Sequence, residues 1–446
     1  MSSSPKRAKI ANLQEDRLSS LPDCILCHIL SFMSTKDAAR TSILSTTWKY
    51  LYLGVQNIDL EENIVEEDEE PGILQPQGSR NRSAGFVGFV NRRLMLNGTS
   101  NITDFRLKCR ELPEAYVSLW LTALLLRAVK VLEIEVLTEQ GNAQSQCPPT
   151  GFFRSQTLVV LKLCGPNIVF KIPEFVCLPS LKVLHLKYLD MQFESDKGIL
   201  AEGSPLLEDL RLDRIRLPKK QWSIARPSIV ASILRIALPK LKRLEFIMPR
   251  EDNRVYDLYL YAPHLQHLEC SLTEEYNPSN MFINSFNSEY LISAKVSPSG
   301  NRVAFTGWQQ VFVRALAKFG TLKELHVSKR FLEFFGRTPS HESLWILLER
   351  SPSLEVLDTA DTGTCSPPEN EPPSCLVQCL KEIRIRKFEG NKDEFSAVQY
   401  FLQHGAVLER MIIQRSSYQI KEWPEVVLRR LLMLARRSSK CQIELN

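Results

Sequence analysis

One apolar phrase recurs through most of this 446-residue chain and constrains its fold more than any other feature. The phrase reads apolar-x-x-apolar-x-apolar, and the starts of successive copies lie 23 to 34 residues apart. Repeats of this length are typical of solenoids, in which each unit buries its apolar face against its neighbours. The copies span residues 102–107, 129–134, 158–163, 181–186, 207–212, 241–246, 265–270, 291–296, 322–327, 354–357, 380–385 and 408–413.

Each phrase has the alternation of a β-strand. Successive side chains of a strand point to opposite faces, so the last two apolar positions of each copy face one core. Parallel stacking of these strands predicts an α/β chain with a curved parallel sheet and a polar concave face. Leucines expected in the interior are Leu184, Leu210, Leu244 and Leu268. An ordinary β-sandwich is the alternative, although sandwiches do not repeat a phrase together with a preceding turn such as Leu178-Pro179.

The polar residues at the centres of the strands are candidates for binding a partner protein. They alternate with the core positions, so a concave sheet presents them together. The candidates are Lys162, His185, Arg211, Glu245 and His326.

The segment from Leu18 to Met33 predicts a helix with an uncharged apolar stripe. Pro22 suits the first turn of a helix, where its missing N–H would be unpaired anyway, and Asp23 complements the helix dipole. Two short amphipathic segments follow, beginning near Thr35 and Ser45. Three helices in so few residues make a small core, so some of this apolar surface is expected to meet a partner.

The order and spacing of these residues resemble the F-box in its plant-type form. The resemblance runs from residue 18 to 53 and includes Leu21-Pro22, Ile29 to Phe32, Lys36-Asp37, and Leu44-Ser45 with Trp48. It implies docking onto the Skp-type adaptor of a cullin-based (SCF) ubiquitin ligase. The adaptor-binding residues implied are Leu18, Leu21, Pro22, Ile25, Leu26, Ile29, Leu30, Phe32, Leu44 and Trp48. A small helical subdomain packed onto the rest of the chain is the alternative.

The repeats resemble the irregular leucine-rich repeats (LRRs) that follow plant F-boxes. The Asn or Cys that usually follows the strand is mostly missing, although Cys164 fits this position. Without this residue the curvature of the solenoid is expected to be less even, but the predicted fold class does not change.

The end of the chain carries a further resemblance. A strand at 379–390, a helix at 394–402 and a strand at 407–411 are similar to the FBD domain, which accompanies F-boxes in many plant proteins. The final segment, 438–445, also looks like that domain's last strand. Solenoids need a cap at their open ends, so this module is expected to close the sheet.

Composition sets the expected domain boundaries. We expect a disordered N-terminus at 1–17, the F-box at 18–53, a linker at 54–83, irregular leucine-rich repeats at 84–371, and the FBD domain with its cap at 372–446. Residues 61–70 hold seven acidic side chains, which is typical of a solvated loop.

Composition also argues against several classes of protein. No stretch reaches the roughly 18 apolar residues of a membrane span. A formal net charge of +5 is too small for this length to indicate a nucleic-acid partner. The absence of a signal peptide, and eleven cysteines without a compact framework, indicate an intracellular protein in the nucleus, the cytoplasm or both.

No set of residues with catalytic spacing occurs. Cys24 and Cys27 have the spacing of metal ligands, but no second pair completes a zinc site. Phosphate-binding loops and nucleophile motifs are also missing. We therefore expect a non-enzymatic protein without a metal or cofactor.

The resemblances together predict a substrate-recognition subunit of a cullin-based ubiquitin ligase. The helices would hold the Skp-type adaptor and, through it, the cullin, while the solenoid would hold an unknown target protein. Two alternatives stay open: a scaffold that holds the adaptor without delivering a substrate for degradation, and a receptor whose concave face needs a small ligand.

Overall fold

The computed structural model describes most of the chain in sixteen stretches. These are residues 18–62, 76–96, 101–110, 114–137, 150–166, 168–193, 203–218, 220–221, 230–248, 254–272, 280–287, 290–297, 320–327, 343–359, 371–415 and 425–446. The expected disordered N-terminus at 1–17 and most of the acidic run at 61–70 lie outside these residues.

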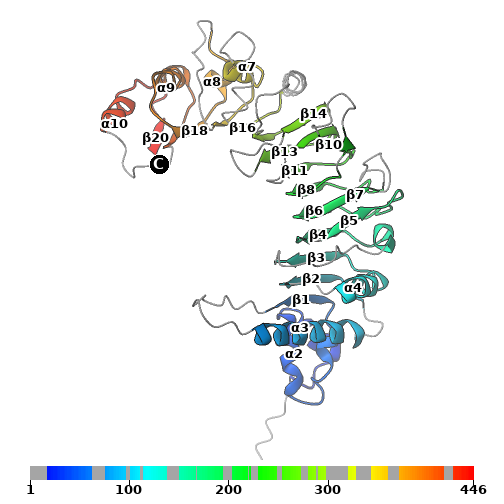
Figure 1. Ribbon diagram of the computed structural model, residues 1–446. Coiled ribbons are helices and arrows are strands. Elements are labelled where there is room, and N and C mark those ends of the chain that lie inside the picture. The colour runs from blue at the N-terminus through cyan, green and yellow to red at the C-terminus, as the bar shows by residue number, and fades with distance from the viewer. Residues whose placement is uncertain are drawn as a thin grey trace, which may run out of the picture.

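Within the described residues, fourteen strands form one sheet along the inner side of an arc (Figure 1). Every neighbouring pair in this sheet is parallel, as the repeated phrase predicts. In order across the sheet, the strands are β1 (Asn57–Glu61), β2 (Asp104–Cys109), β3 (Val131–Val136), β4 (Val160–Cys164), β6 (Val183–Lys187), β8 (Asp209–Asp213), β11 (Arg243–Met248), β13 (His267–Leu272), β15 (Ser293–Ser297), β16 (Glu324–Val327), β17 (Val356–Thr359), β18 (Glu382–Phe388), β19 (Arg410–Arg415) and β20 (Gln442–Leu445).

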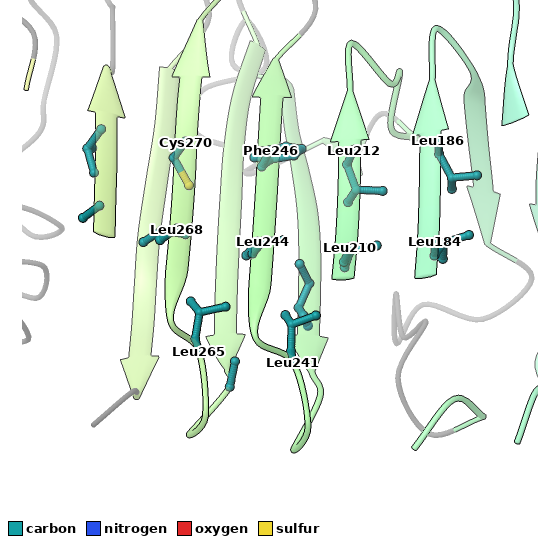
Figure 2. Close-up of a cluster of buried hydrophobic side chains, with 14 of the residues drawn as sticks. Leu184, Leu186, Leu210, Leu212, Leu241, Leu244, Phe246, Leu265, Leu268 and Cys270 are labelled. Carbon is teal, nitrogen blue, oxygen red and sulfur yellow. The ribbon is translucent and has the colours of Figure 1, made fainter. Parts of the chain in front are cut away.

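The apolar phrase sets the register of this sheet. Leu184 pairs with Leu210, Leu210 with Leu244, and Leu244 with Leu268, so equivalent positions lie side by side. Figure 2 shows these leucines in one row across adjacent strands. All four are buried, whereas Lys182 is exposed. The structure therefore confirms the predicted interior positions and excludes the sandwich alternative.

A second layer covers the convex side of the sheet (Figure 1). Helices form it near the two ends of the arc, and strands form it in the middle. Its helices are α3 (Pro76–Leu96), α4 (Glu114–Leu126), η3 (Thr150–Arg154), α7 (Ser343–Glu349), α8 (Ser374–Gln378), α9 (Lys392–His404) and α10 (Glu425–Leu432). Its strands are β5 (Val169–Ile172) with β7 (Asp190–Phe193), and β9 (Lys220–Gln221), β10 (Val230–Ala237), β12 (Arg254–Tyr261) and β14 (Asn280–Asn287).

The solenoid begins earlier than the predicted boundary. A linker is expected over residues 54–83, but β1 lies within them and pairs with β2. Its side chains alternate, with Ile58 and Leu60 buried. The segment from Val55 to Leu60 is itself a copy of the apolar phrase, which explains why it joins the sheet.

The N-terminal helices form a small core of their own beside β1. They are α1 (Asp23–Leu30), α2 (Thr35–Arg40), η1 (Thr41–Ile43) and η2 (Leu51–Gly54). The third segment, expected as a helix from Ser45, consists of turns that lead into the short 3-10 helix η2. Thr46 and Thr47 are poor helix formers, and the burial of Trp48 fixes the chain in this less regular path.

The C-terminal strands extend the same sheet and the same core. The helix predicted at 394–402 is α9, and its capping box starts one turn earlier than this range. Asn391 accepts a hydrogen bond from Glu394 N, while the Glu394 carboxylate accepts from Gly390 N at 2.7 Å and Asn391 N at 3.0 Å. Gly390 has a φ of +82°, which only glycine adopts without strain.

Candidate protein-binding surfaces

The N-terminal helices expose an apolar surface on their outer side. Seven of the ten predicted adaptor-binding residues are exposed: Leu18, Leu21, Pro22, Ile25, Ile29, Phe32 and Leu44. Phe32 is 79% exposed, although a large aromatic side chain normally seeks burial. Met33, Ile43 and Tyr50 are also exposed and were missed, because they lie outside the motif residues that guided the prediction.

The other three predicted residues lie inside. Leu26, Leu30 and Trp48 are buried in a core that also contains Ala38, Leu51 and Val55. Leu26 and Leu30 are four residues apart, so they share the inner face of α1. The Trp48 indole N–H donates to Ser19 Oγ at 2.9 Å, which fixes the ring. These three residues hold the outer surface in place and do not form it.

Local sequence explains how this surface is presented. Pro22 starts α1 with an extended backbone, and its carbonyl oxygen accepts hydrogen bonds from Ile25 N at 2.9 Å and Leu26 N at 3.1 Å. Ser34 caps α2 by accepting from Asp37 N. Gly54 lies where a Cβ would be 2.7 Å from Cys27 Sγ, so a larger residue would displace the Cys27 side chain.

Cys24 and Cys27 do not share one environment. Cys24 is exposed, whereas the Cys27 thiol donates to Leu51 O at 3.3 Å, and burial raises its pKa. Within the described residues, no three His, Cys, Asp or Glu side chains gather in a way that would hold a metal ion.

A buried arginine joins the N-terminal helices to the solenoid. Arg93 of α3 donates hydrogen bonds to Val55 O at 2.6 Å and Leu53 O at 3.3 Å. Burial lowers the pKa of its guanidinium to about 10. The hydroxyl of Thr35 in α2 adds a second link by accepting from Asp59 N of β1 at 2.7 Å. The two modules therefore meet through fixed hydrogen bonds between buried groups.

The five predicted partner-binding residues all reach the concave face and are partly exposed. Each lies beside a charge on its own or a neighbouring strand. Lys162 Nζ lies 2.9 Å from Glu133, His185 Nε2 lies 3.2 Å from Asp209, and Arg211 Nη1 lies 3.4 Å from Glu245. The concave face thus carries a ladder of ion pairs between neighbouring strands, and a charged partner has to replace existing pairs.

Two hollows divide these residues into two groups. One, of about 300 Å³, is lined by Arg211, Glu245 and His326 together with Arg243, His267 and Lys295. The other, of about 380 Å³, is lined by Lys162 and His185 together with Arg106, Lys108 and Lys187. The structure therefore brings the candidates together in two places along the arc.

Among the described residues of this face, Asp358 is the most buried acidic group. His326 Nδ1 lies 3.1 Å from Asp358 Oδ2, and Arg386 pairs with the same oxygen. Burial alone would raise the pKa of this carboxyl, but the hydrogen bonds from His326 and Arg386 outweigh it and lower the pKa. His326 is therefore held by a negatively charged partner.

A short apolar stripe crosses the concave face and was missed. Val131, Val160 and Val183 pair with one another on β3, β4 and β6, and all three are half-buried on the side away from the core. They occupy the first outward position of each strand, whereas the predicted candidates include only the central charged position. An apolar residue within a polar row was the signal that could have identified them.

None of the described helices is long and apolar enough to cross a membrane.

Comparisons with known proteins agree with this arrangement. The F-box domain model matches residues 18–51, and the FBD model matches residues 367–413. An F-box/LRR-repeat protein of Arabidopsis thaliana is 30% identical, over 96% of this chain and 94% of that protein. An F-box/FBD/LRR-repeat protein of the same plant is 27% identical, over 98% of each chain.

Among solved structures, a TLR13–ssRNA13 complex aligns with 78% of this chain and 50% of its own, at 15% identity and a TM-score of 0.31. The two Arabidopsis relatives match this chain nearly end to end, and the two domain models match its N-terminal and C-terminal parts. The chain belongs to the family of F-box/LRR-repeat proteins, and its C-terminal module is an FBD domain.

Proposed function

We propose that this protein is the substrate-recognition subunit of an SCF-type ubiquitin ligase. The observation that carries the proposal is the two-sided packing of α1. Its inner side closes a small core, while Ile25 and Ile29 on its outer side, and Leu21 just before the helix, stay exposed in the segment that matches the F-box model. An apolar surface of this kind in a polar chain marks a protein-binding site. Its occupant would be the Skp-type adaptor.

The solenoid would hold the target protein on its concave face. This face is separate from the outer surface of α1, and the junction at Arg93 fixes the two in relation to each other. A fixed relation raises the effective concentration of a target lysine near a conjugating enzyme that the cullin recruits. The chain itself would carry out no bond chemistry, and it would act in the nucleus, the cytoplasm or both.

Adaptor docking is tested with two exposed residues that directly precede α1. Replacing Leu21 and Pro22 together by alanine removes an apolar anchor, which is worth about 2 kcal/mol and about thirtyfold in affinity. Leu126→Ala is the matched control, because Leu126 is 81% exposed on α4, outside the F-box. The readout is the dissociation constant for a purified Skp-type adaptor. Unchanged adaptor binding by the double variant would show that this surface does not dock the adaptor.

A second experiment separates a ligase subunit from a scaffold or a ligand-dependent receptor. The chain is affinity-purified from cells with the proteasome blocked, and cullin and captured proteins are identified. Captured proteins that carry ubiquitin and accumulate only under the block support the ligase. Captured proteins whose levels do not change when the proteasome is blocked indicate a scaffold. Capture that is lost on dialysis and restored by a small-molecule extract indicates a receptor.

The concave face is tested in the same purification. Arg211→Glu reverses one charge of the ladder beside Glu245 and Asp209. We expect this variant to keep adaptor binding and to lose target capture. Arg154→Glu, an exposed position in η3, serves as the control.

A further inference from the structure

The outer side of α10 belongs neither to the proposed adaptor-binding surface nor to the concave face of the sheet. Its inner side is anchored to the C-terminal core by Leu431, with Val427 and Leu434 packed against the same core. Arg430 adds a contact, since its guanidinium carbon lies 4.1 Å from the centroid of the Phe395 ring. Figure 1 shows α10 at the C-terminal end of the arc, far from α2. The helix is thus held firmly and presents its outer side in one geometry.

Large apolar side chains are left uncovered on this outer side. Val426 is 78% exposed, Leu432 54% and Met433 82%. Met433 N donates to Arg429 O at 3.1 Å, so the helical turn continues through Met433. Val426 and Met433 are seven residues apart, with Arg429 between them, and these three therefore share one face.

Positive charge surrounds these apolar side chains. Residues 425–440 contain five cationic side chains and one carboxylate, and that carboxylate pairs with Arg429. Arg436 is exposed and donates to Cys441 O at 2.9 Å, and Arg437 and Lys440 are exposed beyond the helix. A surface with excess positive charge beside exposed apolar side chains is complementary to an acidic partner that has apolar side chains of its own.

We propose that the outer side of α10, together with the turn to Lys440, binds an acidic, amphipathic segment of a partner protein. Apolar side chains of the segment would contact Val426, Leu432 and Met433, while its carboxylates would meet Arg437 and Lys440. Residues 425–440 contain no aromatic side chain on which a nucleobase could stack, which favours a protein over single-stranded nucleic acid. This site is independent of the F-box, so it stands or fails separately from the proposed ligase function.

The test uses the complete chain and fluorescence anisotropy. The probe is a fluorescein-labelled 16-residue peptide in which Glu and Asp alternate with Leu and Phe. Poly-aspartate of equal length and a 16-nucleotide single-stranded DNA are the comparison probes. We expect the amphipathic peptide to bind at least tenfold more tightly than either comparison probe.

Two double variants separate the apolar from the charged contribution. Leu432→Ser with Met433→Ser removes the apolar contacts, and Arg437→Glu with Lys440→Glu reverses the charge. Each should weaken peptide binding at least tenfold. Lys130→Glu with Lys240→Glu changes two exposed cations elsewhere on the solenoid and should alter binding less than twofold. All six changed positions lie at the surface, so circular dichroism and thermal midpoints should match those of the unmodified chain.

Several outcomes would overturn the proposal. Equal binding of poly-aspartate, or equal losses in the control variant, would show general charge attraction only. Tighter binding of the DNA that depends on Arg437 and Lys440 would assign the surface to nucleic acid. Dimer formation in light scattering that Leu432→Ser with Met433→Ser abolishes would assign it to a second copy of this chain. Absence of measurable peptide binding would also reject the proposal.

Discussion

At the scale of single residues, the repeated leucines have one role and the charges beside them have another. Each interior leucine fills a space between neighbouring repeats, and Leu210 is fully buried between Leu184 and Leu244. Charged residues of adjacent repeats meet in ladders, as Glu208 and Lys242 do at 2.7 Å. Burial of the leucines supplies the larger part of the stability, because exposed ion pairs are screened by water.

Replacing Leu210 by alanine is expected to lower the free energy of unfolding by about 2–5 kcal/mol, because the cavity that remains cannot close fully. The measurement is the shift of the urea midpoint, followed by circular dichroism. Lys182→Ala, at an exposed position of the preceding repeat, is the control and should change stability by less than about 0.5 kcal/mol. Equal effects of the two substitutions would contradict the interior position of Leu210.

A pH effect is expected at Glu355. Lys323 and Lys381 lie 2.8 and 2.7 Å from its carboxylate, and their hydrogen bonds lower its pKa from about 4.5 to about 2. A carboxyl whose pKa is lower in the folded state than in the unfolded state stabilises the fold at any pH above its unfolded-state pKa. This contribution disappears as the pH falls through the folded-state pKa.

The stability difference between the unmodified chain and Glu355→Gln should therefore be largest at pH 6–7 and shrink between about pH 4.5 and 2. Its size should stay below about 1 kcal/mol, since the group is exposed to screening. Urea unfolding at several pH values measures the difference. A stability difference that grows as the pH falls would contradict the expected sign.

At the scale of elements, the junction between α3 and η2 fixes the orientation of the F-box relative to the solenoid. The backbone carbonyls of Leu53 and Val55 point to Arg93, whose side chain is almost completely buried. The Tyr52 ring lies 6.0 Å from the same guanidinium carbon. An apolar residue at position 93 would leave both carbonyl oxygens without this donor.

Arg93→Met is therefore expected to cost about 1–3 kcal/mol locally, the usual effect of leaving buried polar groups unpaired. Hydrogen exchange should become faster at residues 51–55, while β6 and β8 keep their protection. Arg92→Met is the matched control, because Arg92 is the exposed neighbour on the same helix. Unchanged exchange at 51–55 would show that the junction does not depend on this side chain.

At the scale of the whole molecule, one continuous core runs from Ile58 to Cys441, and the F-box has its own small core. The FBD module is part of the continuous core, because β18 pairs with β17 and α9 packs Phe401 against Trp345 of α7, with ring centroids 5.2 Å apart. Removal of this module would expose the interior of the last repeats to water.

A chain that ends at residue 371 should keep adaptor binding but lose solubility and target capture. Hydrogen exchange should show loss of protection first in β16 and β17, the strands nearest the new end. Deletion of residues 1–17, which precede the F-box match, is the control and should leave both properties unchanged. Full protection in β16 and β17 of the shortened chain would mean that the FBD domain is an independent unit.

The sequence alone determined the sheet and most of its register. The repeated phrase specifies which side chains enter the core, and burial of that set leaves little freedom for another register. It also placed the five partner-binding candidates on one face, because alternation along a strand is a local property. The overlooked copy at Val55 to Leu60 follows the same rule, so the signal for β1 was present in the sequence although the strand was not predicted.

Only the tertiary structure decided which apolar residues of the F-box stay exposed. Leu26 and Ile25 are adjacent and equally apolar, but Leu26 faces Trp48 and Leu51 in the core while Ile25 faces outward. Helical periodicity divides such residues into faces but does not say which face the neighbouring segments cover. The link from Arg93 to Val55 was likewise invisible in the sequence, because it joins residues 38 positions apart whose meeting depends on how α3 packs beside the F-box.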